Sequence, residues 1–405
     1  MKTLITNIGQ LVTPRGRGPV AGKRMSELTI YKGVDLLING EKVAEISDRI
    51  DESGVDRLID ADGGVALPGM VDAHTHAVFA GTREREEEFL ARAQGIPYDG
   101  GGILASAHAV AQTSEEGLLK HSLPHLRRML QSGTTTIEIK SGYGLSLEGE
   151  LKLLVAIRQV KKALPLRVIA TFLGAHGFPE GVSRDDYIST IITQMIPTVR
   201  RRRLAQFCDV FCDRGFYTLA ETRTILRAAR GAGLLLKMHA DELACTGGAE
   251  LAAELEVTSA DHLLRASEKG MKRLGQAGVI PVLLPGTAFT LGSTYAPARK
   301  MIKLGLPIAL ATDFNPGTCL IYSMLTIIGL AVMKMGLSVE EAITAATLNA
   351  ACALDLADQI GTLEKEKAAD LILLDLDTYR QIPYFFAHNP VRMVIKDGQV
   401  VYESS

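Results

Sequence analysis

The stretch GVALPGMVDAHTH, residues 64–76, combines a continuous apolar run with two histidines directly after it. A short apolar run without polar alternation is typical of a strand buried on both faces, as in a parallel sheet. His74 and His76 lie two residues apart, so on a strand their side chains point in the same direction. The stretch therefore predicts a buried strand that ends in two imidazoles.

Seven further apolar runs follow, and helical patterns lie between many of them, often with a glycine just past the end. Eight strand–helix units over about 290 residues predict an α/β fold, a (β/α)8 TIM-like barrel. A doubly wound open sheet is the alternative, although no G-x-G-x-x-G follows the first strand. The seven runs are TTTIEIK (134–140), LRVIATFLGA (166–175), FCDVFC (207–212), LLLKMHA (234–240), VTSADH (257–262), VIPVLL (279–284) and PIALAT (307–312). The helical patterns include residues 115–133, 148–164, 219–233 and 247–256.

The two ends of the chain differ from its middle. Residues 1–65 contain short strand patterns separated by glycine turns, and residues 361–405 contain similar strands around a loop with Pro383 and Pro390. We predict a small β-sandwich domain formed by both ends, with the barrel over residues 66–360.

Composition limits the classes of partner. The chain has 405 residues, 47% of them hydrophobic, which is enough for a large core. A formal charge of −2 creates no field that would attract nucleic acid or an anionic membrane surface. The start lacks the apolar core of a secretory signal, and five cysteines form no disulfide framework. We expect a cytoplasmic protein that acts on a small molecule.

A barrel of this kind gathers its chemistry at the carboxyl ends of the strands. Five of the nine histidines follow predicted strands directly, together with several other polar residues. We therefore expect residues that are distant in sequence to meet at one rim. These residues are His74, His76, Lys140, Tyr143, His176, Asp213, His239, Glu242, His262, Asp313 and Asn315.

Four of them form a candidate metal site. His74, His76, His239 and Asp313 offer three nitrogens and one oxygen with a position left for water, as in catalytic zinc sites. An H-x-H pair alone is weak evidence for a metal site, because two polar histidines that are merely hydrogen-bonded would show the same sequence pattern. The run FCDVFC (207–212) offers no lysine at its end to bridge two metals, which favours one ion.

Glu242 and His262 are candidates for proton transfer. Glu242 lies three residues after His239, where it is either an ordinary helix-start carboxylate or a group that passes protons at the metal centre. His262 is either a hydrogen-bonded core histidine or a contact of the bound water and the developing oxyanion. We interpret Lys140 and Lys237 as structural charges of the barrel.

Arg83, Tyr143 and His176 follow the first three predicted strands, and together they would hold a substrate carboxylate. His121 and His125 have a spacing that can bind metal, but we interpret them as the polar face of an outer helix. The run RRRR at 200–203 is interpreted as solvated or as an interface contact.

The stretch TDFNPGTC, residues 312–319, follows the eighth predicted strand. Backbone N–H groups and small side chains in this stretch could bind a polar ring, at Asn315, Gly317 and Thr318. A plain Asn-Pro-Gly turn is the alternative.

Several motifs resemble, in order, those of the imidazolonepropionase family within the amidohydrolase superfamily. The resemblance spans nearly the whole chain, and KSGYGL with TDFNPG is more specific than HTH. It implies hydrolysis of the cyclic amide 4-imidazolone-5-propionate to N-formimino-L-glutamate, a step of histidine degradation, with a metal-bound hydroxide attacking the ring carbonyl. It also implies one metal ion, Zn2+ or Fe2+/Fe3+, and a homodimer. The motifs are HTH (74–76), GGGILAS (100–106), IEIKSGYGL (137–145), TFLGAH (171–176), HADEL (239–243), SADHL (259–263), LPGTAF (284–289) and TDFNPG (312–317).

The resemblance also implies roles for individual residues. Metal ligands fall on His74, His76, His239 and Asp313. The catalytic positions fall on Glu242, His262 and Asp313. Substrate contacts fall on Arg83, Tyr143, His176, Glu242, Asn315, Gly317 and Thr318.

The sequence departs from the family pattern at RRRR (200–203), HGFPEG (176–181) and CLIYSM (319–324), which bears on the shape of the carboxylate pocket. Two other functions are alternatives. One is a related amidohydrolase, such as a deaminase, which shares the ligand positions. The other is a catalytically silent relative that serves as an assembly scaffold, against which the intact ligand positions speak.

Overall fold

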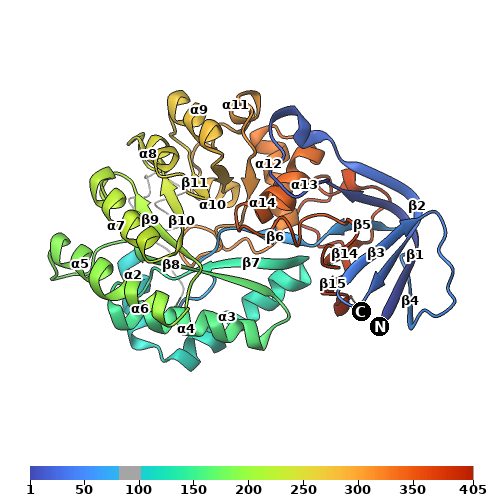
Figure 1. Ribbon diagram of the computed structural model, residues 1–405, viewed down its shortest axis with the longest axis horizontal. Coiled ribbons are helices and arrows are strands. Elements are labelled where there is room, and N and C mark those ends of the chain that lie inside the picture. The colour runs from blue at the N-terminus through green and yellow to red at the C-terminus, as the bar shows by residue number, and fades with distance from the viewer. Residues whose placement is uncertain (82–101, 405) are drawn as a thin grey trace.

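The computed structural model describes residues 1–81 and 102–404. A barrel of parallel strands surrounded by helices makes up most of the described chain, and a sheet built from both chain ends lies at one side of it (Figure 1). The two termini belong to this side sheet (Figure 1).

Eight strands form the barrel, and each pairs in parallel with the next along the chain. The barrel closes beyond the ends of its first and last strands, where His76 N donates to Phe314 O (2.8 Å) and Asp313 N donates to His74 O (3.0 Å). The predicted barrel is confirmed, and the open-sheet alternative is wrong. The strands are β6 (Met70–Asp72), β7 (Thr134–Lys140), β8 (Arg167–Ala175), β9 (Phe207–Cys212), β10 (Leu235–Ala240), β11 (Ser259–His262), β12 (Ile280–Leu283) and β13 (Ala309–Leu310).

Helices follow most of the barrel strands, and serine caps start several of them. Ser114, Ser146 and Ser267 each accept a hydrogen bond from the backbone N–H three residues further on, which satisfies one of the free donors of a helix start. Within the described ranges, no helix is both long and apolar enough to cross a membrane. The helices are α2 (Gly102–Gln112), α3 (Glu115–Gln131), α4 (Leu147–Ala163), α5 (Arg184–Thr190), α6 (Ile196–Arg201), α7 (Leu219–Gly231), α8 (Gly248–Glu254), α9 (Glu268–Ala277), α10 (Pro285–Thr290), α11 (Ala298–Lys303), α12 (Met324–Met335), α13 (Val339–Ala346) and α14 (Leu348–Cys352), with a π-helical turn η2 (Ile191–Met195) and 3-10 turns η1 (Gly22–Ser26) and η3 (Tyr379–Gln381).

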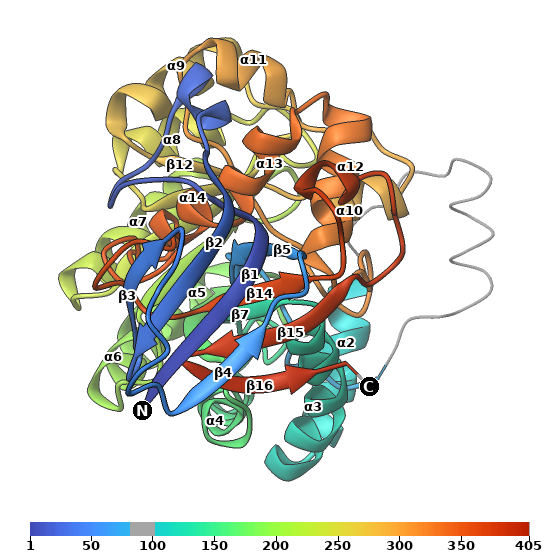
Figure 2. The same cartoon turned by 90° about the vertical axis from the view of Figure 1, so that its right-hand side faces the viewer.

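The side sheet joins strands from the two ends of the chain, as the sequence predicts (Figure 2). Hydrogen bonds connect its strands in the order β16-β15-β14-β5-β1-β2-β3, with β4 paired to β1, so the strands of the predicted sandwich belong to one continuous sheet. The domain boundaries at residues 66 and 360 stay a prediction. The strands are β1 (Lys2–Thr13), β2 (Thr29–Asn39), β3 (Lys42–Ser47), β4 (Arg57–Asp60), β5 (Val65–Pro68), β14 (Leu371–Leu374), β15 (Val391–Lys396) and β16 (Gln399–Glu403).

The first predicted barrel strand is divided at Gly69. Its beginning, β5, pairs with β14 and β1 in the side sheet, whereas its end, β6, pairs with β7 in the barrel. Gly69 N donates to Asp370 O (2.8 Å), and a Cβ atom at this position would lie 2.3 Å from Thr135 Oγ1. A glycine is therefore required where the chain passes from one sheet to the other, and β6 leads directly to His74 and His76.

Candidate active site

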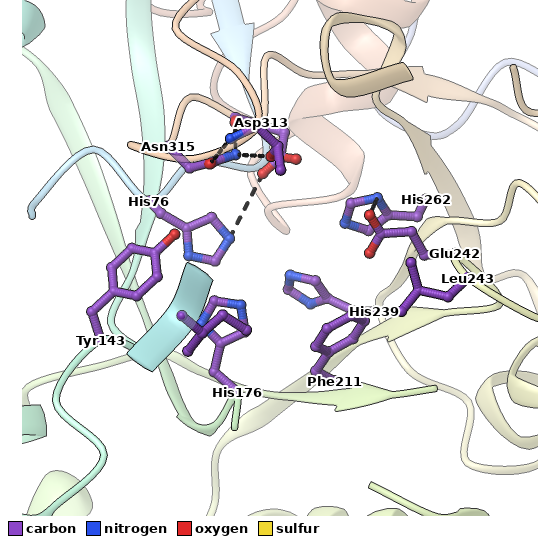
Figure 3. Close-up of a pocket in the computed structure, with 12 residues that line it drawn as sticks. His76, Tyr143, His176, Phe211, His239, Glu242, Leu243, His262, Asp313 and Asn315 are labelled. Carbon is purple, nitrogen blue, oxygen red and sulfur yellow. Dashed lines mark hydrogen bonds and ion pairs between the residues drawn. The ribbon is translucent and has the colours of Figure 1, made fainter. Parts of the chain in front are cut away.

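The carboxyl ends of the barrel strands surround a pocket with mainly polar walls (Figure 3). Most of the residues predicted at the rim lie around it, although they come from strand ends far apart in the sequence. Its walls include His76, Tyr143, His176, His239, Glu242, His262, Asp313, Asn315 and Thr318, with Ile103, Phe211 and Leu243 as apolar neighbours.

The three predicted imidazole ligands meet at the base of this pocket. Ligand-capable atoms of His74, His76 and His239 lie within 4.8 Å of one another, and all three side chains are buried. Asp313 Oδ1 lies 3.5 Å from Nε2 of His74 and 3.7 Å from Nε2 of His76. The fold thus brings the four predicted ligand positions into one cluster.

The state of the imidazole nitrogens fits a metal ion. Within residues 1–81 and 102–404, Nε2 of His74 and Nε2 of His239 are buried and have no hydrogen-bond partner. Buried polar atoms without a partner are rare and need an explanation. Burial, together with nearby positive charge, lowers the pKa of His74 and His76 well below the ordinary value, so both are neutral as metal ligands must be. This donor set fits a divalent metal ion.

Two aspartates lie behind the imidazoles. Asp261 Oδ2 lies 2.6 Å from Nδ1 of His74, and Asp209 Oδ2 lies 3.1 Å from Nδ1 of His239. A carboxylate on the far nitrogen sets the orientation and tautomer of a histidine ligand. Neither aspartate is among the residues predicted from the sequence, although a charged residue inside an apolar strand such as β9 is a signal that could have identified one.

Asp313 is held in a strained and buried position. Its φ of +52° lies in the left-handed region, which residues other than glycine rarely adopt. Thr287 Oγ1 donates to its Oδ2 (2.5 Å), and burial raises the pKa of Asp313 to about 6. The threonine leaves Oδ1 directed toward His74 and His76.

Glu242 and His262 lie beside each other across the pocket from Tyr143 (Figure 3). Glu242 Oε1 is 3.5 Å from Nδ1 of His262. Burial raises the pKa of Glu242 well above its ordinary value, and the charges of Asp313 and Asp213 add to this effect. A carboxyl group whose pKa is raised toward neutrality is suited to proton transfer. The arrangement supports the proton-transfer interpretation over that of an ordinary helix-start carboxylate.

Asp213 holds the loop that carries Glu242. Its carboxylate accepts hydrogen bonds from the backbone N–H groups of Glu242 (2.7 Å), Leu243 (2.9 Å) and Ala244 (3.1 Å). The sequence placed Asp213 at the rim without a role. In the structure it anchors the backbone on which the candidate acid–base group sits.

Replacing Asp213 by asparagine is expected to lower kcat by roughly tenfold to 100-fold, because misplacing a reacting group by about 1 Å can cost 10²-fold. The amide has one acceptor oxygen and cannot hold three backbone N–H groups. Steady-state kinetics and metal analysis measure the effect, and bound metal should stay unchanged. Asp186→Asn, at the exposed start of α5, is the matched control. An unchanged kcat in Asp213→Asn would contradict the anchoring role.

Glu150 organises the loop that carries Tyr143. This buried carboxylate accepts hydrogen bonds from the backbone N–H groups of Gly142 (3.0 Å), Gly144 (2.7 Å) and Leu145 (3.0 Å). The carbonyl of Gly142 lies 3.0 Å from Nδ1 of His176. Glu150 is not among the residues predicted from the sequence, although it lies behind two of the predicted substrate contacts, Tyr143 and His176.

The loop after β13 is closed by the Asn315 side chain. Its Nδ2 donates to Asp313 O and to Thr318 Oγ1, both at 2.7 Å, and its Oδ1 accepts from the backbone N–H groups of Gly317 (2.9 Å) and Thr318 (2.7 Å). The Asn315 amide thus orders the turn from within, and Asn315 and Thr318 line the pocket.

Arg83 lies outside the described residues, so its predicted substrate contact stays a prediction. Two other predictions concern α3. His121 is exposed, as expected for the outer face of α3, but His125 is half-buried, with its ring 5.9 Å from that of Phe79 and 5.4 Å from that of Phe314. The interpretation of His125 as part of a solvated face is therefore wrong, because α3 turns it toward the barrel.

Comparisons with known proteins agree with this architecture. The sequence profile of the amidohydrolase family matches residues 65–401. The imidazolonepropionase of Syntrophobacter fumaroxidans is 45% identical over 96% of this chain and 95% of that protein, and the imidazolonepropionase of Alkaliphilus oremlandii is 42% identical over 98% and 97%. The zinc complex of atrazine chlorohydrolase from Arthrobacter aurescens has a TM-score of 0.72 at 17% identity, over 99% of this chain and 95% of that chain, which shows a shared fold. The chain belongs to the amidohydrolase family.

Proposed function

We propose that this protein hydrolyses the cyclic amide of 4-imidazolone-5-propionate to give N-formimino-L-glutamate, in histidine degradation. The names of its full-length relatives support this substrate. The observation that carries the chemistry is the buried cluster of His74, His76, His239 and Asp313, with unpartnered imidazole nitrogens, beside the carboxyl group of Glu242.

One metal ion, Zn2+ or Fe2+/Fe3+, would be held by the three histidines and Asp313. When bound, such an ion supplies Lewis-acid polarisation of a carbonyl and lowers the pKa of water from 15.7 to about 7. The three neutral imidazoles carry no charge, so Asp313 provides the single negative charge of the set. Asp261 accepts the Nδ1 proton of His74, and Asp209 Oδ2 lies 3.1 Å from Nδ1 of His239. A carboxylate beside Nδ1 keeps the opposite nitrogen of the ring available.

Glu242, His262 and Asp313 would handle protons and developing charge. Water adds to the ring carbonyl carbon, the carbon–nitrogen bond breaks, and the ring nitrogen gains a proton. Glu242 takes a proton from the attacking water and delivers it to that nitrogen. Its raised pKa lets it hold the proton between the two steps. His262, next to Glu242, orients the water and donates to the oxyanion, with Asp313 as an acceptor opposite.

Tyr143, His176, Glu242, Asn315, Gly317 and Thr318 would contact the substrate ring and its side chain. Tyr143 and His176 lie together on one wall, with ring centroids 5.3 Å apart, and the loop ordered by Asn315 forms part of another. A phenol, an imidazole and backbone N–H groups are suited to a polar ring and a carboxylate. Arg83 completes this set as the anchor of the propionate group, on the resemblance alone.

Replacing Arg83 by alanine is expected to raise KM for the propionate-bearing substrate by roughly tenfold to 100-fold, the value of a charge-assisted hydrogen bond. For an analogue whose carboxylate is converted to an uncharged amide, the same substitution should raise KM much less. Steady-state kinetics on both compounds measure the difference. Equal losses on both compounds would argue against a carboxylate anchor.

The resemblance further supports a homodimer located in the cytoplasm. Light scattering on the purified protein measures its mass against 43.6 kDa for one chain. A monomer at working concentration would contradict the dimer.

The proposed reaction is tested by incubating purified, metal-loaded protein with fresh 4-imidazolone-5-propionate. The ultraviolet band of the substrate should disappear and N-formimino-L-glutamate should accumulate without ammonia. Ammonia without a ring-opened acid would indicate a deaminase. A stoichiometric metal content without turnover on this substrate would overturn the proposed reaction and favour a catalytically silent relative.

A further inference from the structure

A cluster of charged side chains is buried inside the barrel, below the imidazoles. Barrel interiors are usually filled by branched apolar residues, and burying a charge is costly unless it is paired and hydrogen-bonded. Five charges at this depth therefore need a reason. They are Glu138 and Lys140 on β7, Asp209 on β9, Lys237 on β10 and Asp261 on β11, all with 0% exposure.

Lys140 lies at the centre of this cluster. Its Nζ is 2.9 Å from Glu138 Oε1, 2.8 Å from Asp209 Oδ2 and 3.4 Å from Asp261 Oδ2, so three carboxylates surround its three N–H donors. Burial alone would lower the pKa of this ammonium, but the charges of Asp209, Glu138 and Asp261 hold it well above the ordinary value. Lys140 is therefore charged throughout the physiological range.

Two of these carboxylates, Asp209 and Asp261, also lie behind the metal-site histidines. In each of them, one oxygen atom contacts both the Lys140 ammonium and the imidazole. Asp209 Oδ2 faces Lys140 and Nδ1 of His239, and Asp261 Oδ2 faces Lys140 and Nδ1 of His74. One ammonium thus connects two imidazoles that come from opposite parts of the sequence. An imidazole whose Nδ1 donates to a carboxylate presents Nε2 to a ligand.

We propose that Lys140 is a positioning residue of the metal site, which orients Asp209 and Asp261 and thereby directs Nε2 of His239 and His74 toward the ion. This inference rests on the metal centre of the proposed function. Without the ammonium, the Oδ2 atoms of Asp209 and Asp261 lose the donor that fixes them. A carboxylate that is free to turn no longer fixes the imidazole in front of it, so the histidine loses its orientation.

Lys237 provides a control within the same cluster. It is equally buried, but its Nζ lies 3.3 Å from Glu138 Oε2 and donates to the carbonyl of Ala73 (3.1 Å). Within the described chain it forms no ion pair with either aspartate behind the histidines. Lys140 and Lys237 therefore share burial and charge but differ in their contact with Asp209 and Asp261.

The test compares Lys140→Met, Lys237→Met and the double variant Glu138→Gln with Lys140→Met. The double variant removes one positive and one negative charge, so the net charge of the cluster is that of the unaltered protein. Thermal unfolding measures stability, competition with a chelator measures metal affinity, and the visible spectrum of the Co2+ form reports on ligand geometry. These readouts do not depend on turnover.

We expect Lys140→Met to weaken metal binding about 10- to 100-fold, the usual loss when groups behind metal ligands are removed, and to alter the Co2+ spectrum. The double variant should recover stability but keep the weakened affinity. Lys237→Met should lower stability but leave the metal affinity near that of the unaltered protein.

Unaltered metal affinity in Lys140→Met, or recovered metal affinity in the double variant, would overturn the inference while leaving the proposed function intact. If Lys140→Met does not fold, the double variant alone decides. An unaltered protein that binds no metal would overturn both.

Discussion

Replacing Asp313 by alanine is expected to remove the bound metal and nearly all turnover. Asp313 supplies the one negative charge of the proposed ligand set, and its Oδ1 lies 3.5 Å and 3.7 Å from Nε2 of His74 and His76. Three neutral imidazoles are left to hold a cation without a charged ligand. Without the ion, the pKa of the attacking water is no longer lowered to about 7. The rate should therefore drop by several orders of magnitude.

Metal content by mass spectrometry and the initial rate, measured on the same preparation, test this expectation. Asp313→Asn keeps the shape but not the charge, and it should retain more metal than Asp313→Ala. His125→Ala is a suitable control, because this histidine packs on Phe314 next to Asp313 without joining the cluster. A folded Asp313→Ala protein with full metal content and full activity would remove Asp313 from the ligand set.

Glu242→Gln is expected to lower kcat by about 10² to 10⁴, the range for loss of a general acid–base group. Glutamine matches the shape of glutamate but cannot accept and return the proton. Glu242 lies 3.5 Å from Nδ1 of His262, and burial with nearby negative charge raises its pKa. Bound metal should stay at the level of the unaltered protein, because Glu242 is not part of the three-histidine group.

The rate and the metal content together show whether Glu242 carries the proton or binds the metal. Glu254→Gln alters an exposed carboxylate that pairs with Arg223 outside the pocket, and it should leave both quantities unchanged. An unchanged kcat in Glu242→Gln would exclude Glu242 as the proton carrier. Loss of metal in that variant would instead assign it to the ligand set.

Local sequence patterns were sufficient for the barrel strands. TTTIEIK at 134–140 and FCDVFC at 207–212 coincide with β7 and β9, because a strand buried on both faces must be continuously apolar except where a buried charge is paired. The rule that strand ends share one rim then placed His74, His76, His239 and Asp313 together. The division of residues 64–73 at Gly69 was not predictable in this way, because β5 and β6 are both short apolar runs and differ only in the partner strand that each one reaches.

The contacts of the residues that support the site could not be predicted from local sequence patterns. Asp209, Asp261 and Lys140 look like isolated charges in apolar strands, and their meaning comes from distances of 2.6 to 3.4 Å across the barrel. The types of side chain and their positions on strands follow from the pattern along the chain, because backbone geometry repeats over a few residues. Which buried charge meets which imidazole depends on how the strands pair and how the barrel closes. Strand pairing brings Asp209 to His239, 30 residues away, and closure brings Asp261 to His74, 187 residues away, and no local periodicity encodes these contacts.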